Sequence, residues 1–530
     1  MTGHVQRRAA RPLPKSVSSR IMVTKPLRSG MWVKMNVDRR GMLLGGAVSV
    51  LASSLPFFVK AQVPQESHGP HALQAPGQDA AHPPDHTIRI ATGSVELGPN
   101  TTITTKLYNG QFPGPLLRFV EGKRVAVDIC NDTDTPEQLH WHGQFVPAEV
   151  DGVAEEGTPF IPARGSKRVI FEPRPAGFRF YHTHVSAGTD LAAGLYTGQA
   201  GLVFIEPQNY PGAYDREVFL TLKEFGPYLS RMEMPSDFLI PNNRDPILET
   251  AHKQARSHDV GQGYEVDYSF FSLNGRMLGH GEPIRVKAGE RVLFHILNAS
   301  ASGIRSLALG QHVFKVVALD GFLVPRPSEV PVLWIAPAER ISAIVEMRRP
   351  GVWVLGDINA ENRRRGLGIV VEYAEANGEP IWGRPPHSGW DYRRFGRSDI
   401  APAKPDETIE LTFAARIGAR NGFDEFTING VAFSMTKMEP LFHLVHNHRY
   451  RIHMRNATEE IHPIHLHRHV FEITSISGSP TSGVMKDVVM LGGLQEMTID
   501  FTADQLGLSL LHCHMQPHMD FGFMALFACS

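Results

Sequence analysis

One pattern occurs three times in this chain, and it limits the possible folds more than any other feature. Each copy begins with Asn-Gly, continues through a strand, a tight turn and an alternating strand, and closes on an asparagine. Successive copies lie roughly 160 residues apart, which is the size of a domain and too long for a solenoid repeat. The Asn-Gly asparagines are Asn109, Asn274 and Asn429, and the closing ones are Asn131, Asn298 and Asn456.

The strands inside the repeat favour an all-β chain. Apolar residues occupy every second position from Arg124 to Ile129, as in a strand with one buried face. Glycine and proline together make up about 17% of the 530 residues, against an ordinary total of about 12%, so turns are frequent. We therefore expect three β-sandwich domains and one connector rich in Pro, Gly and Arg. The domains are placed at 87–208, 209–374 and 406–530, and the connector at 375–405.

The composition excludes several classes of protein. A net charge of −1 with interspersed charges gives no basic surface for nucleic acid. With 42% hydrophobic and 20% charged residues, the chain is globular and not disordered. Three cysteines cannot build a disulfide scaffold or a set of cysteine-rich zinc modules, whereas 26 histidines point to metal binding.

The first 61 residues resemble a twin-arginine export signal. Arg39-Arg40 precede an apolar run from Met42 to Val59, and Ala61 ends a segment that suits a signal peptidase. Glycines and serines in that run make it weakly hydrophobic, so cleavage is favoured over the alternative of an uncleaved membrane anchor. We expect export of a folded precursor and a periplasmic or secreted protein without a transmembrane span.

Two details qualify this export signal. The stretch before the arginines is long for a signal, so Met31 or Met35 is an alternative start. Residues 62–86 are rich in Pro, Gln, His and Gly, which is typical of a flexible lead-in.

Six His-x-His pairs occur where random placement of the histidines would give about one. Comparison of the three repeat copies excludes two of these pairs as candidate metal ligands. Asn447 takes the turn position of Gly122 and Gly289, so we interpret the flanking His446 and His448 as surface residues. The segment around His469 matches that around His312, which has no partner histidines, so both are interpreted as structural. Four pairs remain: His140/His142, His182/His184, His465/His467 and His512/His514.

Strand geometry predicts that both histidines of each pair face the same site. Residues i and i+2 of a strand point to the same face, so each pair offers two imidazoles to one place. Two pairs lie in the first domain and two in the third, which predicts one multinuclear site of eight imidazoles at the interface of those domains. For any single pair, a structural histidine or a zinc site is the alternative.

Cys513 lies between His512 and His514 and therefore faces the opposite side of the strand. There its thiolate can bind a second metal while remaining a few bonds from the histidine cluster. His462 and His518 would complete a His₂Cys set, the combination of blue copper electron-transfer centres.

In these motifs the sequence resembles the multicopper oxidases, and within them the laccase group. The matching motifs are HWHG at 140–143, YHTH at 181–184, HPIHLH at 462–467 and HCHMQPH at 512–518. The resemblance implies three consecutive cupredoxin-like Greek-key domains, the middle one copper-free, and four copper ions. It implies that His462, Cys513 and His518 hold the type 1 copper and that His140 and His465 hold the type 2 copper. One type 3 copper would be held by His142, His182 and His514, and the other by His184, His467 and His512.

Two positions depart from the family pattern. The axial position of the type 1 site, often Met, is Phe523 here, and Met524 follows it. A non-coordinating Phe523 leaves a three-coordinate copper and predicts a relatively high potential, unless a local bulge turns Met524 inward. The second departure is Arg468, where the family usually has Gly.

The resemblance also implies a reaction. A small reducing substrate would be oxidised in four one-electron steps at the type 1 site, Cys513 would carry the electrons, and dioxygen would be reduced to water. Oxygen reduction consumes protons, and Asp151 falls at the position of the family's acidic residue near the type 2 copper; its alternative is a turn residue before Gly152. Where some members carry a second acid after His518, this chain has Met519 followed by Asp520.

The motifs are compatible with more than one class of substrate. We expect phenols and aromatic amines, oxidised by a protein that acts as a monomer. A cuprous or other metal-ion oxidase is the alternative, but the connector 375–405 contains no Met, and only Met435 and Met438 cluster in the third domain. A non-catalytic cupredoxin-like envelope protein is disfavoured by the complete set of ten histidines and one cysteine.

Cys130 and Cys529 have no role in these sites. In an oxidising compartment they could form a disulfide between the first and third domains, and two free thiols are the alternative.

Overall fold

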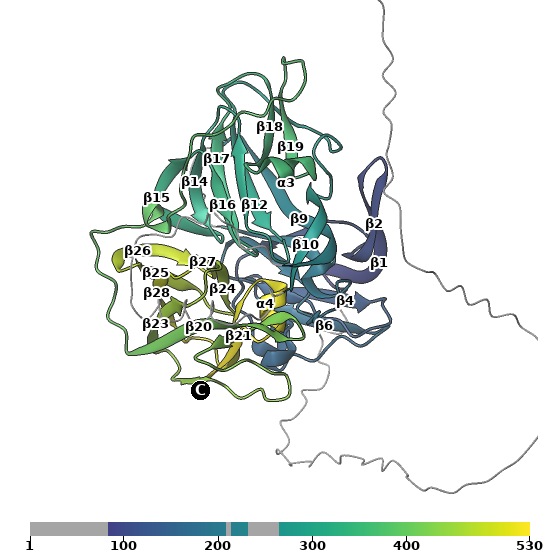
Figure 1. Cartoon of the computed structure of the whole chain (residues 1–530). Coiled ribbons are helices and arrows are strands. Elements are labelled where there is room, and N and C mark those ends of the chain that lie inside the picture. Colours follow the sequence, from purple (N-terminus) through teal and green to yellow (C-terminus); the bar gives the residue numbers. More distant parts are fainter. Residues whose placement is uncertain (1–82, 208–213, 232–263) are drawn as a thin grey trace, which may run out of the picture. The chain divides into compact units, whose positions relative to one another are not determined.

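The computed structural model describes residues 83–207, 214–231 and 264–530 (Figure 1). The expected export signal at 1–61 lies outside these residues, and so does most of the expected lead-in at 62–86. His86, the last residue of the expected lead-in, is already the first residue of β1 (His86–Gly98), so the first domain begins at least one residue earlier than expected. Among the described residues, no helix has the length and apolarity needed to cross a membrane.

The first domain consists of two four-stranded sheets. Both contribute to one buried cluster, in which Ile88 and Val127 of one sheet pack with Leu117 and Val203 of the other. The first sheet has the order β2-β1-β4-β6, with β1 His86–Gly98, β2 Thr101–Tyr108, β4 Val125–Asn131 and β6 Ser166–Phe171. The second has the order β3-β8-β7-β5, with β3 Gly114–Val120, β5 His140–His142, β7 Gly177–His182 and β8 Ala200–Glu206. Three short helical segments lie in its loops: α1 Ala148–Asp151, η2 Ala154–Glu156 and η3 Gly194–Tyr196.

The middle domain pairs a six-stranded with a five-stranded sheet. The six-stranded order is β10-β9-β12-β17-β14-β15, with β9 Arg216–Arg231, β10 Tyr264–Leu273, β12 Arg291–Asn298, β14 Phe314–Leu319, β15 Phe322–Val330 and β17 Arg340–Glu346. The five-stranded order is β11-β19-β18-β13-β16, with β11 Ile284–Val286, β13 Arg305–Leu309, β16 Leu333–Ile335, β18 Val352–Asp357 and β19 Gly368–Tyr373. The helix α3 (Ala360–Arg364) follows β18.

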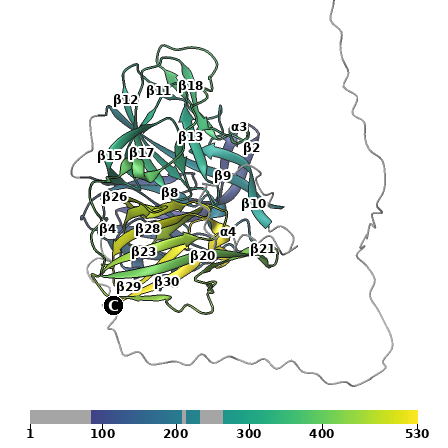
Figure 2. The ribbon, with the colours of Figure 1, turned by 60° about the vertical axis from the view of Figure 1, so that its left-hand side comes forward.

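The third domain repeats the arrangement of the middle one strand for strand. Its six-stranded order is β21-β20-β23-β28-β25-β26, with β20 Glu407–Arg420, β21 Phe423–Ile428, β23 Arg449–Asn456, β25 Phe471–Ile476, β26 Ser479–Lys486 and β28 Glu496–Thr502. Its five-stranded order is β22-β30-β29-β24-β27, with β22 Phe442–Leu444, β24 His462–Leu466, β27 Val488–Leu491, β29 Gly507–Cys513 and β30 Met524–Cys529. Figure 2 shows the neighbours β23 and β28 of one sheet and β29 and β30 of the other. The helix α4 (Gln516–Asp520) lies between the last two strands.

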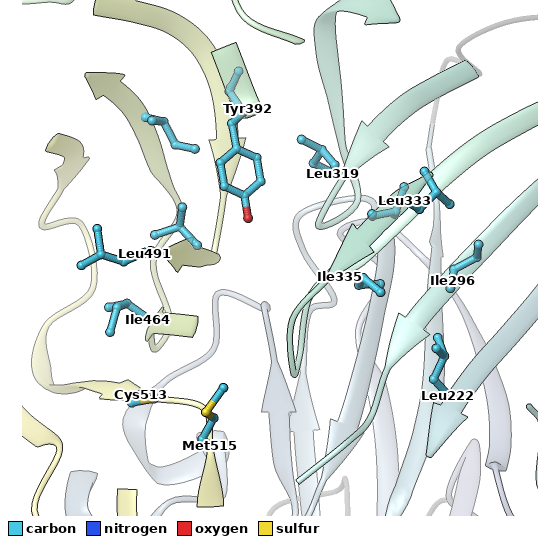
Figure 3. Close-up of a cluster of buried hydrophobic side chains, with 14 of the residues drawn as sticks. Leu222, Ile296, Leu319, Leu333, Ile335, Tyr392, Ile464, Leu491, Cys513 and Met515 are labelled. Carbon is cyan, nitrogen blue, oxygen red and sulfur yellow. The ribbon is translucent and has the colours of Figure 1, made fainter. Parts of the chain in front are cut away.

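One buried cluster continues from the middle into the third domain. Figure 3 shows Leu333 and Ile335 on the middle domain and Ile464 and Cys513 on the third. Tyr392 joins the same cluster from η4 (Tyr392–Phe395), inside the connector. The apolar core of these two domains is therefore continuous, and it contains the cysteine singled out from the sequence.

The three repeat copies have the same local geometry. Asn109, Asn274 and Asn429 have φ angles of 51°, 51° and 52°. Each accepts a hydrogen bond from one backbone N–H of a neighbouring strand and donates to one backbone carbonyl there. The closing asparagines Asn131, Asn298 and Asn456 are fully buried, and their amides donate to backbone carbonyls of loops and, for Asn298, also of the end of β16. The repeat therefore marks the turn and the loop anchor of each domain.

The turn and the structural histidines also follow the repeat. Asn447 has a φ of 64°, close to the 72° of Gly122 and 82° of Gly289. His312 and His469 are both buried, and the Nδ1 atom of each contacts the carbonyl oxygen two residues earlier, at 2.5 and 2.9 Å. These equal contacts in two domains agree with a structural role for both histidines.

Candidate metal centre

The four histidine pairs lie at the ends of paired strands. His140 on β5 is the register partner of His182 on β7, and His465 on β24 is the partner of His512 on β29. All eight imidazoles are buried. Each pair therefore lies at the end of a strand and is buried in the protein interior.

The structure brings the eight histidines into one cluster across the first and third domains. The rings of His142 and His465 stack with centroids 3.8 Å apart, and those of His140 and His467 stack at 4.2 Å. Within this cluster, sets of three donor atoms lie within 4.8 Å of one another. One of these sets contains His184, His467 and His512, the triad that the family resemblance assigns to one type 3 copper.

A second set lies beside the first. The Nδ1 atoms of His462 and His518 are 3.1 Å apart, and the Cys513 Sγ atom lies 3.8 Å from the former and 3.5 Å from the latter. Cys513 is fully buried, whereas the side chain of His518 is 12% exposed. Since Cys513 is bonded to His512 and His514, the two sets share one strand end.

Unpartnered donor atoms show that these residues suit metal ions. The Nε2 atoms of His140 and His465 and both ring nitrogens of His184 and His514 are buried, and they have no hydrogen-bond partner among the described residues. Leaving such atoms without a partner costs about 1–3 kcal/mol each, so a ligand is expected there. The His₂Cys set and the imidazole cluster offer the thiolate and nitrogen donors that copper prefers.

Burial also keeps the imidazoles in the state that metals bind. Burial, and then the charge of neighbouring histidines, holds the pKa of most of them well below the ordinary value. Burial lowers the pKa of both His462 and His512 to about 3. A neutral imidazole is the form that coordinates a metal, so these imidazoles need not lose a proton to bind one. His518 differs, because burial would lower its pKa but the contacts with Cys513 and Glu460 outweigh burial and raise that pKa to about 10.

Backbone carbonyls orient several of the rings. The Nδ1 atoms of His140, His182, His465 and His512 contact carbonyl oxygens at 2.7–3.0 Å. Each of these contacts fixes a tautomer that leaves Nε2 unprotonated and facing the cluster. His142 is reversed, because its Nε2 lies 3.2 Å from Asp487 and its Nδ1 lies 3.3 Å from the Nε2 of His182.

Asp151 lies inside the cluster and is fully buried. Its Oδ2 atom is 3.0 Å from His467 Nδ1 and 3.1 Å from His140 Nδ1, and its Oδ1 atom has no partner among the described residues. Asp520 lies elsewhere, where its carboxylate accepts from the backbone of Ala187 and Gly188. The structure therefore places only the first of the two acids considered from the sequence against the histidines.

Three buried acids near the cluster were not singled out from the sequence. Glu156 lies 3.4 Å from His467, Glu155 lies 3.9 Å from His184, and Asp487 contacts His142. Burial raises the pKa of Glu155 to about 7, and burial together with the charge of Asp151 raises the pKa of Glu156 well above its usual range. The signal available was the group of acids at 151–156, which begins nine residues after His142. Nothing in the sequence marks Asp487.

Phe523 and Met524 belong to different buried clusters. Phe523 packs with Cys513, and its ring centroid is 4.9 Å from that of His462. Met524 packs with Val153 and Leu510 instead. The inward-turned Met524 that a bulge would produce is therefore absent from the structure.

Arg468 has a φ of 59°, the conformation that explains a family preference for glycine there. Its Nε atom pairs with Glu156 at 3.2 Å, and its guanidinium donates to the carbonyls of Leu506 and Leu508. The pair with Glu156 links the third domain to the first beside His467, and the two carbonyl bonds hold the guanidinium within the third domain.

The middle domain shows why the same fold holds no such site there. Its strands β13 and β18 take the sheet positions of β24 and β29. Ala308 pairs with Gly356 in the register where His465 pairs with His512. Residues without a donor side chain thus replace two of the histidines.

The surface near His518 is acidic. The Glu460 carboxylate lies 3.2 Å from His518 Nε2 and is 33% exposed. Asp424 is buried nearby, and its Oδ2 atom has no partner among the described residues. The contact with His518 outweighs burial and lowers the pKa of Glu460 to about 2, so this carboxylate is charged at neutral pH.

The remaining two cysteines are free in the structure. Cys130 lies on β4, and the Cys529 thiol donates to the carbonyl of Ala503. Of the two alternatives left open by the sequence, the structure contains the free thiols.

Three sandwiches with a His₂Cys set beside an eight-histidine cluster define a copper-binding protein of the cupredoxin type. Comparison with known proteins identifies the family. Multicopper oxidase family models match residues 89–210, 244–370 and 402–530. The chain belongs to the multicopper oxidase family, whose members bind copper and act on a small-molecule substrate with dioxygen.

Individual relatives span almost the whole chain. It is 28% identical over 506 residues to the multicopper oxidase MmcO of Mycobacterium tuberculosis, covering 92% of this chain and 95% of that protein. Among solved structures, a laccase from Botrytis aclada matches with a TM-score of 0.65 at 17% identity, covering 84% of this chain and 87% of that one. A laccase-like multi-copper oxidase from Ochrobactrum sp. matches with a TM-score of 0.63 at 22% identity, covering 84% and 96%. These structures support the three-domain cupredoxin-like fold.

Proposed function

We propose that the protein is a laccase-like oxidase that couples one-electron oxidation of phenols or aromatic amines to the four-electron reduction of dioxygen to water. The observation that carries this proposal is the covalent link between the two sets of ligands. Cys513 lies in the His₂Cys set, and its neighbours His512 and His514 lie in the histidine cluster. Copper bound in the two sets would supply one-electron redox chemistry and oxygen activation.

The ligand sets would hold four copper ions, with the assignment that the family resemblance implies. Asp151 would deliver protons where oxygen is reduced, because its carboxylate contacts two of the histidines and retains one unpartnered oxygen. Phe523 would fill the axial position without coordinating. A complete donor set with unpartnered nitrogens argues against the alternative of a non-catalytic envelope protein.

Substrates would give up their electrons at His518. It is the partly exposed member of the His₂Cys set, and Phe426 stacks on its ring at 4.1 Å. An aromatic donor needs only to approach the edge of this imidazole. We propose action as a monomer, in the periplasm or outside the cell, after export as a folded precursor.

The carboxylate beside His518 supports metal ions as a second class of substrate. Glu460 lies next to the electron entry point and is charged at neutral pH, and a carboxylate attracts cations such as Cu(I) as well as protonated amines. A periplasmic cuprous-ion oxidase that serves copper tolerance is therefore the alternative.

Turnover of a neutral phenol, an aromatic amine and Cu(I) by the copper-loaded protein distinguishes these functions. Because Glu460 contacts His518, Glu460→Gln should lower turnover of all donors, and it should lower kcat/KM for the cationic donors by up to about fivefold more than for the neutral phenol, the effect of a partly exposed charge. Glu459→Gln makes the same change one residue away and serves as the control. A blue protein that oxidises none of the three donors would contradict the proposed function, and equal effects on all three would contradict a role of Glu460 in substrate choice.

A further inference from the structure

The middle domain is linked to the histidine cluster through Asp487 of the third domain, although its own sheets lack the paired histidines. The turn between β14 and β15 packs against the start of β7 in the first domain. A Cβ atom on Gly177 would lie 2.2 Å from the carbonyl oxygen of Gly321, so the two backbones touch only because both residues are glycines. Arg179 on β7 donates to the carbonyl of Asp320 in that turn.

Arg340, at the start of β17, extends from the middle domain into the third. It is fully buried and forms a two-pronged ion pair with Asp487, with N···O distances of 2.6 and 2.5 Å. Its remaining donors contact the carbonyls of Ala338 and Asp320 at 3.0 and 3.1 Å. The guanidinium therefore has one fixed orientation.

Asp487 in turn contacts two histidines of the cluster. Its Oδ1 atom lies 3.2 Å from His142 Nε2, and its main-chain oxygen lies 2.7 Å from His465 Nδ1. The rings of these two histidines stack at 16°. With Nε2 held by the carboxylate, the Nδ1 atom of His142 is the nitrogen that faces His182.

The groups around this pair are also paired. Lys486 bridges Asp320 and Glu339 at 2.9 and 3.0 Å, and Tyr392 of the connector donates to Glu339. All these side chains are buried. The negative charges of the three acids Asp320, Glu339 and Asp487 are balanced by the positive charges of Arg179, Arg340 and Lys486. A buried carboxylate whose charge is balanced by neighbouring cations can keep a fixed position without water.

The glycine of the first histidine motif gives independent support. Gly143 directly follows His142, and a Cβ atom there would lie 2.5 Å from Asp487 Oδ2 and 2.8 Å from Arg340 Nη2. The motif therefore leaves space for the ion pair that reaches it from the other two domains.

We propose that the middle domain positions His142 for copper through Arg340 and Asp487. Arg340 fixes the Asp487 carboxylate, and this carboxylate fixes the tautomer and the ring orientation of His142. A carboxylate on the second nitrogen of a metal-binding histidine commonly has this effect, and its loss costs about 10–100-fold in metal affinity or activity. The inference rests on copper binding by the histidine cluster and is independent of the substrate.

The test compares copper affinity at the two ligand sets in Arg340→Lys and Asp487→Asn. Arg340→Lys keeps the charge but loses the two-pronged geometry, and Asp487→Asn keeps the shape but loses the charge. Titration with a copper chelator should remove copper from the histidine cluster about 10–100-fold more readily than in the wild type, while the blue thiolate band persists. Electron paramagnetic resonance of the two variants should detect copper ions in the cluster that have lost their magnetic coupling to a neighbouring copper ion.

Arg451→Lys is the matched control. Arg451 of the third domain also forms a two-pronged pair, through its Nε and Nη2 atoms with Asp500 at 2.8 and 2.9 Å, and among the described residues it makes no contact with the histidine cluster. It should leave both copper signals unchanged. If Arg340→Lys and Asp487→Asn retain wild-type affinity at the cluster, or if both signals fall in proportion to the folded fraction, the pair only stabilises the fold and the proposal is wrong.

Discussion

Replacement of Phe523 by methionine tests the assignment of the type 1 site. Phe523 is fully buried in the cluster that contains Cys513, and the proposed function gives it the axial position without a ligand atom. Phe523→Met introduces a thioether there, whereas Phe523→Leu removes the ring without adding a donor. The pair of variants separates the loss of packing from the gain of a ligand.

The structure gives the size of both effects. The ring of Phe523 pairs with Phe413 and Phe426 at centroid distances of 5.0 and 5.7 Å. Loss of two aromatic pairs should lower the free energy of unfolding by about 1–3 kcal/mol in either variant. For a one-electron couple, each 1 kcal/mol by which a thioether contact stabilises oxidised copper would lower the potential by about 40 mV.

Redox titration of the blue band, with chemical denaturation in parallel, measures these effects. We expect similar stability for Phe523→Met and Phe523→Leu, and a potential that is lower only in Phe523→Met. The substitution should also slow oxidation of donors with high potentials. Equal potentials and identical blue spectra in the two variants would show that position 523 is not axial to the metal.

Three further outcomes are expected. Cys513→Ser should abolish both the blue band and substrate oxidation while the protein stays folded; full activity in this variant would refute the electron route. Burial lowers the pKa of Lys223 to about 8 from 10.5, so the folded state binds fewer protons than the unfolded chain between these values, and stability rises with pH there. Relative to Lys223→Met, the wild type should therefore gain up to about 3 kcal/mol between pH 8 and 10.5, and a pH-independent difference in unfolding free energy would contradict this. Alkylation of the denatured, unreduced apoprotein should label Cys130 and Cys529 as well as Cys513, and protection of the first two would reveal a disulfide.

The fold and the histidines could be predicted because each follows from a regular pattern. The positive φ of Asn109, Asn274 and Asn429 requires a residue that tolerates it, so the repeat appears in the sequence. The period of two along a strand groups each histidine pair on one face and separates Cys513 from its neighbours.

The supporting groups could not be predicted because their contacts cross domains. Asp487 and Arg340 are 147 residues apart in sequence, and neither lies in a motif or a periodic pattern. Glu156 and Arg468 meet only once the first and third domains are packed together. The position of His86 in β1 was missed for another reason, since a polar lead-in has no residue that marks where pairing begins.

The central claim is that the His₂Cys set and the histidine cluster act as one oxidase. Oxygen uptake by the copper-loaded protein with a simple phenol, recorded together with the blue absorption, tests it most directly. We predict a blue protein that bleaches with phenol in the absence of oxygen, recovers its colour when oxygen is admitted, and consumes one dioxygen for every four electrons without releasing peroxide. A colourless protein at full copper occupancy, or peroxide as the product, would contradict the account.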